Sequence, residues 1–106
     1  MVFVYPATLV RCIDGDTVRL IVDVGFNMTR NEQPYRLLRI NAPEMSTPDG
    51  AISKAWLETF LVSKSLTIQT FKSDSFGRFL AEVWANGENV SDALVAAGKA
   101  AYKSYA

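Results

Sequence analysis

The feature that most restricts the fold of this chain is a run of alternating residues that follows a tight turn. Apolar side chains occupy every second position of this run, at Val18, Leu20, Val22 and Val24. A period of two is typical of a β-strand that buries one face, and Ile21 is the one lapse in the pattern. The dipeptide Asp14-Gly15 is a strong tight-turn signal, and the apolar-rich segment Leu9–Ile13 precedes it. The sequence therefore predicts two strands joined by a tight turn.

Three more strands are expected along the chain. A third strand covers Pro34–Ile40, after a polar connection at Gly25–Gln33. It ends at Asn41-Ala42-Pro43, because proline lacks the amide that a strand ladder needs. Alternation returns over Thr67–Phe71 and again over Phe79–Trp84, which predicts the fourth and fifth strands.

Two segments have a helical period instead. Residues 51–63 predict a first helix, which Asp49 is placed to cap. Its apolar stripe consists of Ile52, Ala55, Trp56 and Phe60. A second helix is expected to start after Asn89 as its cap and to stop at Gly98. Its stripe consists of Val90, Ala93, Leu94 and Ala97.

The resulting order of elements is βββ-α-ββ-α, in a single domain over residues 1–106. A chain of 106 residues is long enough to form one hydrophobic core. The order fits an α+β fold in which helices pack on a β-barrel, and is compatible with a five-stranded Greek-key barrel of the oligonucleotide/oligosaccharide-binding (OB) type. Periodicity alone does not distinguish this barrel from another α+β sheet.

The composition removes several catalytic chemistries. The chain has no histidine and one cysteine, so it holds no Ser-His-Asp or Cys-His relay, no histidine-ligated zinc and no thiolate metal cluster. Carboxylates, arginines, hydroxyls and hard, oxygen-liganded metals remain. Eleven basic residues balance eleven acidic residues, so any nucleic-acid binding must come from local patches and not from net charge.

Charged residues gather at three places in this layout, all of them turns or strand ends. Asp14 and Asp16 flank the first turn. Arg36 lies on the third strand and Glu44 just beyond it, while Arg78 opens the last strand. Each place taken alone has a plain structural interpretation, as a hairpin turn, a solvated strand end or a hairpin cation.

Together, however, four segments resemble the staphylococcal nuclease-like (thermonuclease) family in order, spacing and context. They are IDGDTV at 13–18, YRLLRINAPE at 35–44, FGR at 76–78 and VSDALVAAG at 90–98. The resemblance implies an OB-type barrel of five strands with helices packed on it. It also implies calcium-dependent hydrolysis of phosphodiester bonds in DNA and RNA.

The resemblance implies a role for each candidate residue. Asp16 looks like the calcium-binding carboxylate, and Glu44 like the carboxylate that positions or deprotonates the attacking water. Arg36 and Arg78 look like the pair that clasps the scissile phosphate. Guanidinium groups suit this task because they donate two aligned hydrogen bonds to oxygens that gather negative charge in the transition state. Attack in line on the 5′ P–O bond would leave 3′-phosphate ends, as in the family.

The sequence departs from the family pattern at the metal. Asn41 stands where the family has a second calcium carboxylate, and Ala42 is expected to offer only its backbone carbonyl. We therefore expect weaker calcium binding, or tolerance of another divalent ion. The alternative is a catalytically silent OB-fold module that binds nucleic acid or a protein.

The chain also differs in its last residues, which lack the long terminal helix and basic tail of larger relatives. Tyr102 and Tyr105 are expected either to contact bases or a terminal phosphate or, equally, to pack against the domain. The expected partner is DNA or RNA, single-stranded, bound by a monomer. Met1–Pro6 has no signal-peptide features, so we expect neither export nor membrane insertion of the chain as given, which leaves a cytoplasmic or a mature secreted protein.

Overall fold

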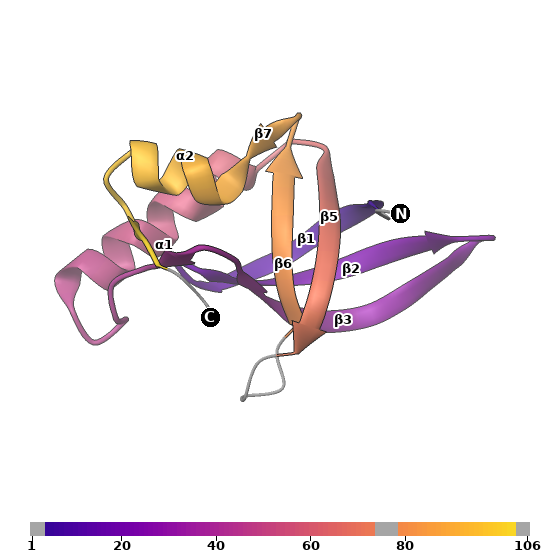
Figure 1. Ribbon diagram of the computed structural model, residues 1–106, viewed down its shortest axis with the longest axis horizontal. Helices are drawn as coiled ribbons and strands as arrows, with labels where there is room; N and C mark the ends of the chain where they lie inside the picture. The colour runs from indigo at the N-terminus through magenta and orange to yellow at the C-terminus, as the bar shows by residue number, and fades with distance from the viewer. Residues whose placement is uncertain (1–3, 74–78, 104–106) are drawn as a thin grey trace.

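A sheet of long β-strands forms the centre of the computed structural model, which describes residues 4–73 and 79–103 (Figure 1). The long strands are β1 (Tyr5–Asp14), β2 (Thr17–Gly25), β3 (Met28–Leu37), β5 (Leu66–Ser73) and β6 (Phe79–Ala85). The short strands are β4 (Ile40–Asn41), β7 (Glu88–Asn89) and β8 (Ala101–Tyr102). The helices are α1 (Pro48–Leu61) and α2 (Val90–Ala96). The expected combination of a β-sheet with two helices is confirmed, and three short strands add to it.

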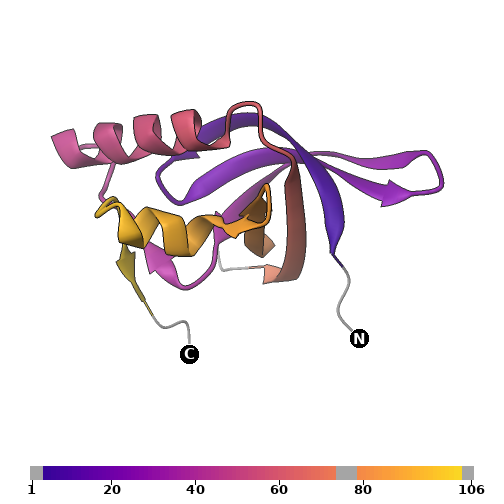
Figure 2. The ribbon, with the colours of Figure 1, turned by 90° about the horizontal axis from the view of Figure 1, so that it is seen from above.

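The strands of the main sheet pair in the order β3-β2-β1-β5-β6-β7, and β3 also pairs with β6 in parallel. The pairing of the long strands thus returns to the strand at which it began. Outside this ring, β4 pairs with β8. Both helices lie on one side of the strands, and the β2–β3 hairpin extends away on the other side (Figure 2).

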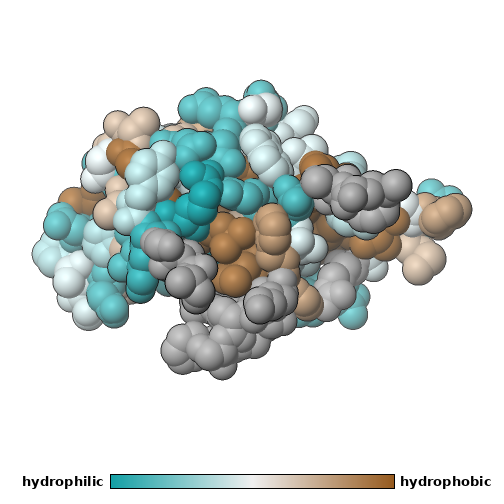
Figure 3. Space-filling view, viewed as in Figure 1, coloured by the Kyte–Doolittle hydropathy of each residue, from teal (hydrophilic) through white to brown (hydrophobic). Residues whose placement is uncertain are grey.

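The alternation in β2 predicts burial correctly up to Val22. Val18, Leu20 and Val22 are buried, whereas Val24 is exposed because it lies next to the turn of the β2–β3 hairpin. The prediction of a polar connection over Gly25–Gln33 is wrong, since a tight turn joins β2 directly to β3. Apolar atoms gather at the tip of this hairpin (right end of Figure 3), where the exposed residues are Val24, Phe26 and Met28.

The third strand also ends earlier than expected. It stops at Leu37, and Arg39 adopts a left-handed backbone conformation with a φ of 69° before β4 starts at Ile40. Such a conformation interrupts a β-strand, because its backbone turns away from the ladder direction. The break turns the chain at Arg39 and sets Ile40 and Asn41 in a separate two-stranded sheet.

Helix α1 differs from its prediction in its cap and in its buried face. The cap is Thr47 and not Asp49: the Thr47 hydroxyl accepts the N–H of Gly50 at 3.2 Å. Ile52 and Ala55 of the expected stripe are exposed, and Trp56 and Phe60 are only partly buried. The buried residues are Gly50, Ser53, Leu57 and Leu61. Close approach of the Glu44 backbone and of the Gly15 turn requires small residues at Gly50 and Ser53, so hydrophobicity alone misplaces the buried face.

Helix α2 agrees better with its prediction. Asn89 caps it, because its side-chain oxygen accepts the N–H of Asp92 at 2.9 Å. Of the expected stripe Val90, Ala93 and Leu94 are buried, and Ala97 is exposed. None of the helices in the described ranges is long and apolar enough to cross a membrane.

Arg39 ties α2 to the sheet. Its guanidinium donates to both carboxylate oxygens of Glu82 on β6, to Asp92 at 2.9 Å and to Asn89 at 3.1 Å. Two hydrogen bonds lower the pKa of the Asp92 carboxyl: the larger effect comes from Arg39 and the smaller from the Tyr102 hydroxyl. Arg39 is therefore engaged in holding the second helix in place.

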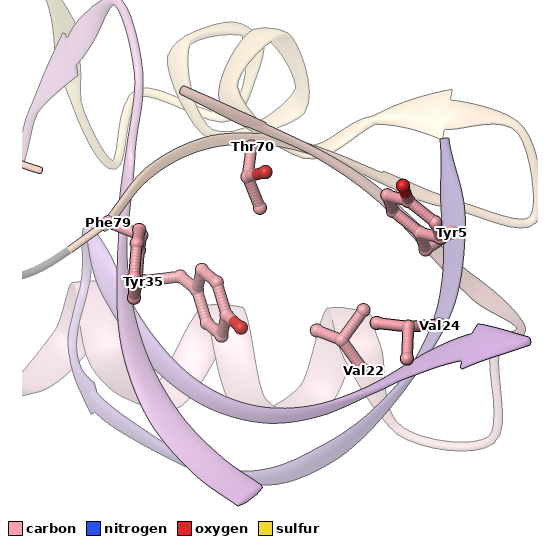
Figure 4. A pocket seen from close by; sticks show the side chains of 6 residues that line it. All are labelled: Tyr5, Val22, Val24, Tyr35, Thr70 and Phe79. Atoms are coloured by element: carbon pink, nitrogen blue, oxygen red, sulfur yellow. The ribbon is translucent and has the colours of Figure 1, made fainter. Parts of the chain in front are cut away.

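The ring of strands encloses most of the core and leaves a small pocket at one end. Cys12 is buried as expected, and burial raises the pKa of its thiol to about 12. The pocket has a volume of about 130 Å³, and side chains from all five long strands surround it (Figure 4). They are Tyr5, Val22, Val24, Tyr35, Thr70 and Phe79. Among the described residues, none that the sequence predicts for the site lines this pocket.

Gly15 allows the turn between β1 and β2 to pack directly against α1 and the end of β4. A Cβ atom at this position would lie 2.1 Å from the Ser53 hydroxyl oxygen and 2.9 Å from the Ala42 Cβ. Its φ is not in the left-handed region, so space and not backbone conformation requires glycine here. The contact presses the turn against two neighbouring segments.

We expect Gly15→Ala to lower the free energy of unfolding by about 1–3 kcal/mol, because the added methyl group overpacks a buried contact. Urea unfolding followed by circular dichroism measures the change. Gly87→Asn is the matched control, since Gly87 has open space around it and a left-handed φ of 86° that asparagine tolerates. Equal stability of Gly15→Ala and the parent protein would contradict this account of the turn.

Candidate metal and phosphate site

The candidate site starts from the turn that joins β1 to β2. The Asp14 carboxylate accepts the backbone N–H of Asp16 at 3.0 Å, which holds the turn in shape. Asp16 itself is 7% exposed, and one of its oxygens accepts the Thr17 hydroxyl at 3.2 Å. A carboxylate that is nearly removed from water needs polar partners, and those come from two other segments.

Arg36 is the cationic partner of Asp16. It lies on β3, whose register places it opposite Thr17, and it is 6% exposed. Its Nη2 lies 3.3 Å from Asp16 Oδ2, and its Nη1 donates to the backbone carbonyl of Leu37 at 2.8 Å. The pair is thus a buried ion pair whose guanidinium is also anchored to its own strand.

The segment after the Arg39 turn completes the group. Arg36 Nη2 also donates to the Asn41 side-chain oxygen at 3.2 Å. The backbone N–H of Ala42 donates to Asp16 Oδ2 at 2.9 Å. The structure therefore brings together Asp16, Arg36, Asn41 and Ala42, four residues that the sequence predicts for the site. The contact of Ala42 runs through its N–H, whereas the prediction concerned its carbonyl.

The protonation of Asp16 reflects competing influences. The pKa of its carboxyl is raised from 3.8 to about 6, first by burial and then by a hydrogen bond with the Asp14 side chain. The Ala42 N–H and the charge of Arg36 act in the opposite direction. The raised pKa shows that these partners only partly offset the loss of water around the carboxylate.

The donor atoms fit a hard divalent cation. Asp16 Oδ2 and Asn41 Oδ1 already converge on one positively charged nitrogen, Arg36 Nη2. Carboxylate and amide oxygens are ligands that calcium accepts. In residues 4–73 and 79–103 no three His, Cys, Asp or Glu side chains gather in one group, so a cation here would depend on few charges.

Glu44 lies in the loop between β4 and α1, two residues after Ala42. Its backbone carbonyl accepts both the N–H and the hydroxyl of Thr47, at 3.0 and 2.6 Å. A Cβ on Gly50 would lie 2.0 Å from the same carbonyl oxygen, so the first turn of α1 packs on this backbone. The Glu44 carboxylate is exposed and has no hydrogen-bonding partner in the described part of the chain.

An open hollow of about 380 Å³ adjoins Asn41 and Ala42. The segments that line it are 41–43 and 98–101. Tyr102, the residue after the second segment, is 58% exposed, and its hydroxyl donates to Asp92 at 2.7 Å. Its neighbours in the fold are thus the cap region of α2 and Arg39. Arg78 and Tyr105 lie outside the described residues.

Sequence reasoning missed two residues that support this arrangement. Asp14 was noted in the turn but not given a role, although it contacts both the backbone and the side chain of Asp16. Ser53 is 1% exposed and donates to the Lys99 carbonyl at 2.8 Å, which joins α1 to the wall of the hollow. A signal was available for Ser53: it shares the i, i+4 row of Leu57 and Leu61.

Comparisons with known proteins find similar sequences over most of the chain. The sequence model of a family described as "Staphylococcal nuclease homologue" matches residues 34–106. Two proteins named "Uncharacterized endonuclease", from Escherichia coli O157:H7 and from Escherichia coli, are each 34% identical over 99 residues, covering 92% of this chain and 61% of theirs. "Protein ParB" from Escherichia coli is 33% identical over 103 residues, covering 87% of this chain and 54% of its own. The chain thus spans roughly half to three fifths of the length of these curated relatives.

The raised pKa of Asp16 predicts a pH dependence of stability. Because the folded state binds this proton more tightly than the unfolded state, its contribution to stability is full below about pH 4 and is lost as the pH rises to about 6. We therefore expect the stability of the parent protein, relative to Asp16→Asn, to decline over this range in chelator. Urea unfolding at a series of pH values measures the difference. A flat difference would mean that Asp16 titrates normally.

Proposed function

Because this chain belongs to the family of staphylococcal nuclease homologues, we propose that it is a metal-dependent nuclease that hydrolyses phosphodiester bonds of DNA or RNA. The ring of long strands that carries the site is assigned to the OB-type barrel of the family. Relatives of which this chain spans only a part carry the name endonuclease, which supports the same reaction class.

The observation that carries the proposal is the convergence of the buried pair Asp16 and Arg36 with the exposed Asn41. A phosphodiesterase of this kind needs a cation site, a guanidinium for the phosphate and an open approach. The Asp16 and Asn41 oxygens share Arg36 Nη2, and the hollow beside Asn41 leaves room for a nucleotide. These contacts and the adjoining hollow support the proposal.

In this proposal Asp16, Asn41 and the carbonyl of Ala42 hold a calcium ion or another divalent ion. When bound, such an ion supplies positive charge next to a phosphate oxygen. Arg36 donates hydrogen bonds to the phosphate, and Arg78 is the second donor that the family resemblance implies. Glu44, with its exposed carboxylate, orients the attacking water and accepts its proton.

The proposed substrate is single-stranded DNA or RNA, bound by a monomer. Tyr102, which follows the residues that line the hollow, would add a stacking or phosphate contact, and Tyr105 is a further candidate for this role. The alternative function is a silent binding module. One observation favours it: Asn41 contributes a neutral amide, so the site offers less negative charge to a cation.

A digest decides between these functions. We expect cleavage of single-stranded DNA with calcium, or with magnesium or manganese, and none in excess chelator. Glu44→Gln should keep the fold and lose about 100- to 1,000-fold in rate, because it removes the proton acceptor. Glu58→Gln, an exposed glutamate on α1, is the matched control. Cleavage in chelator would exclude the metal mechanism, and no cleavage with any ion would favour the binding module.

Restoring a second carboxylate tests the position of Asn41. We expect Asn41→Asp to bind calcium about tenfold or more tightly, because a full negative charge replaces an amide dipole at close range. Calorimetric titration of both proteins measures the affinity. Asp49→Asn, which changes an exposed charge in the first turn of α1, serves as a control for net charge. Equal calcium affinity of Asn41→Asp and the parent would place Asn41 outside the metal shell.

A further inference from the structure

We propose that Arg36 and the divalent cation exchange at the oxygens of Asp16 and Asn41, so that cation binding releases the Nη2 end of Arg36 toward the substrate phosphate. The proposal rests on the proposed nuclease function and concerns the regulation of the same site. It makes cation loading and phosphate binding parts of one event.

The first step of the argument is that the two cations compete for the same atoms. Arg36 Nη2 lies 3.3 Å from Asp16 Oδ2 and 3.2 Å from Asn41 Oδ1. An ion coordinated by these oxygens would lie close to both of them, in the space that Nη2 fills. A divalent ion and a guanidinium nitrogen also repel each other strongly at such a separation. Arg36 must therefore withdraw Nη2 when the ion binds.

The second step is that Arg36 has a pivot for this movement. Its Nη1 donates to the Leu37 carbonyl at 2.8 Å, a bond that involves neither Asp16 nor Asn41. The guanidinium can keep this anchor while Nη2 leaves the carboxylate. Asp16 keeps its hydrogen bonds from the Ala42 N–H and the Thr17 hydroxyl. Its buried carboxylate therefore retains two donors when the ion replaces Arg36.

The third step is that charge balance makes each binding event favour the other. Without an ion, Arg36 neutralises Asp16, and the ion must first displace this cation. Without phosphate, a released guanidinium has lost a charged hydrogen bond in a nearly buried position, which is costly. A phosphate group accepts that hydrogen bond. Cation and phosphate should therefore each bind more tightly in the presence of the other.

The test compares calcium binding by Arg36→Met and by the parent protein, with calorimetric titration in the absence of nucleotide. Methionine keeps a long unbranched side chain and removes the competing cation, so we expect calcium affinity to rise about tenfold or more. Arg19→Met removes the same charge at a guanidinium that binds Glu32 on β3, and should change the affinity less than about twofold. Unchanged or weaker calcium binding by Arg36→Met would overturn the exchange.

A second measurement uses the parent protein alone, so it does not depend on the folding of a buried variant. Calcium titrations are repeated with saturating thymidine 5′-monophosphate, and nitrogen NMR follows the guanidinium signals of Arg36. We expect the nucleotide to tighten calcium binding, and calcium to shift the Nη2 signal. Independent binding of the two ligands, with an Arg36 signal that calcium leaves unaltered, would overturn the proposal.

These outcomes are separable from those of the proposed function. If the parent protein cleaves DNA with calcium but Arg36→Met gains no calcium affinity, the nuclease stands and the exchange fails. If no divalent ion supports cleavage while Arg36→Met binds calcium more tightly, the exchange stands and the nuclease function fails.

Discussion

The buried contact between Asp16 and Arg36 is the interaction on which the candidate site depends. An ion pair that is almost closed to water forms only where further hydrogen bonds satisfy both partners, because desolvation otherwise exceeds the attraction. Here those bonds come from the Leu37 carbonyl, the Asn41 amide and the Ala42 N–H. The pair thereby fixes the relative positions of the β1–β2 turn, β3 and the start of the loop toward α1.

Close packing around the turn gives this contact its precision. The absence of a side chain at Gly15 lets the turn lie against Ser53 and Ala42, and Gly50 lets α1 lie against the Glu44 backbone. The first helix is therefore placed by glycine and serine contacts as much as by its apolar residues. Ser53 extends the same support to the Lys99 carbonyl beside the hollow. Closely packed segments of this kind hold charged groups in fixed positions relative to each other.

Two arginines on neighbouring segments illustrate how position decides role. Arg36 lies on β3 and faces the turn, whereas Arg39, three residues later, follows a left-handed break and binds Glu82, Asn89 and Asp92. Both are charged, planar and nearly adjacent in sequence. Arg36 pairs with the buried Asp16 carboxylate, and Arg39 holds the second helix. The family resemblance selected Arg36 as a candidate site residue, and the structure shows why Arg39 does not join the group around Asp16: the chain turns at Arg39 and directs it to α2 and β6.

The sequence by itself determined the mixture of strands and helices, the cap at Asn89, and the segments that carry Asp16, Arg36 and Asn41, because local periodicity and short motifs encode these features. Only the tertiary structure decided that β3 begins at Met28, that Thr47 caps the first helix, and that this helix buries Gly50 and Ser53 together with Leu57 and Leu61. These depend on how closely separate segments approach, which no local pattern records. The position of Arg36 Nη2 between Asp16 and Asn41 is of the same kind, since it brings the β1–β2 turn next to β3 and the segment that follows the Arg39 turn.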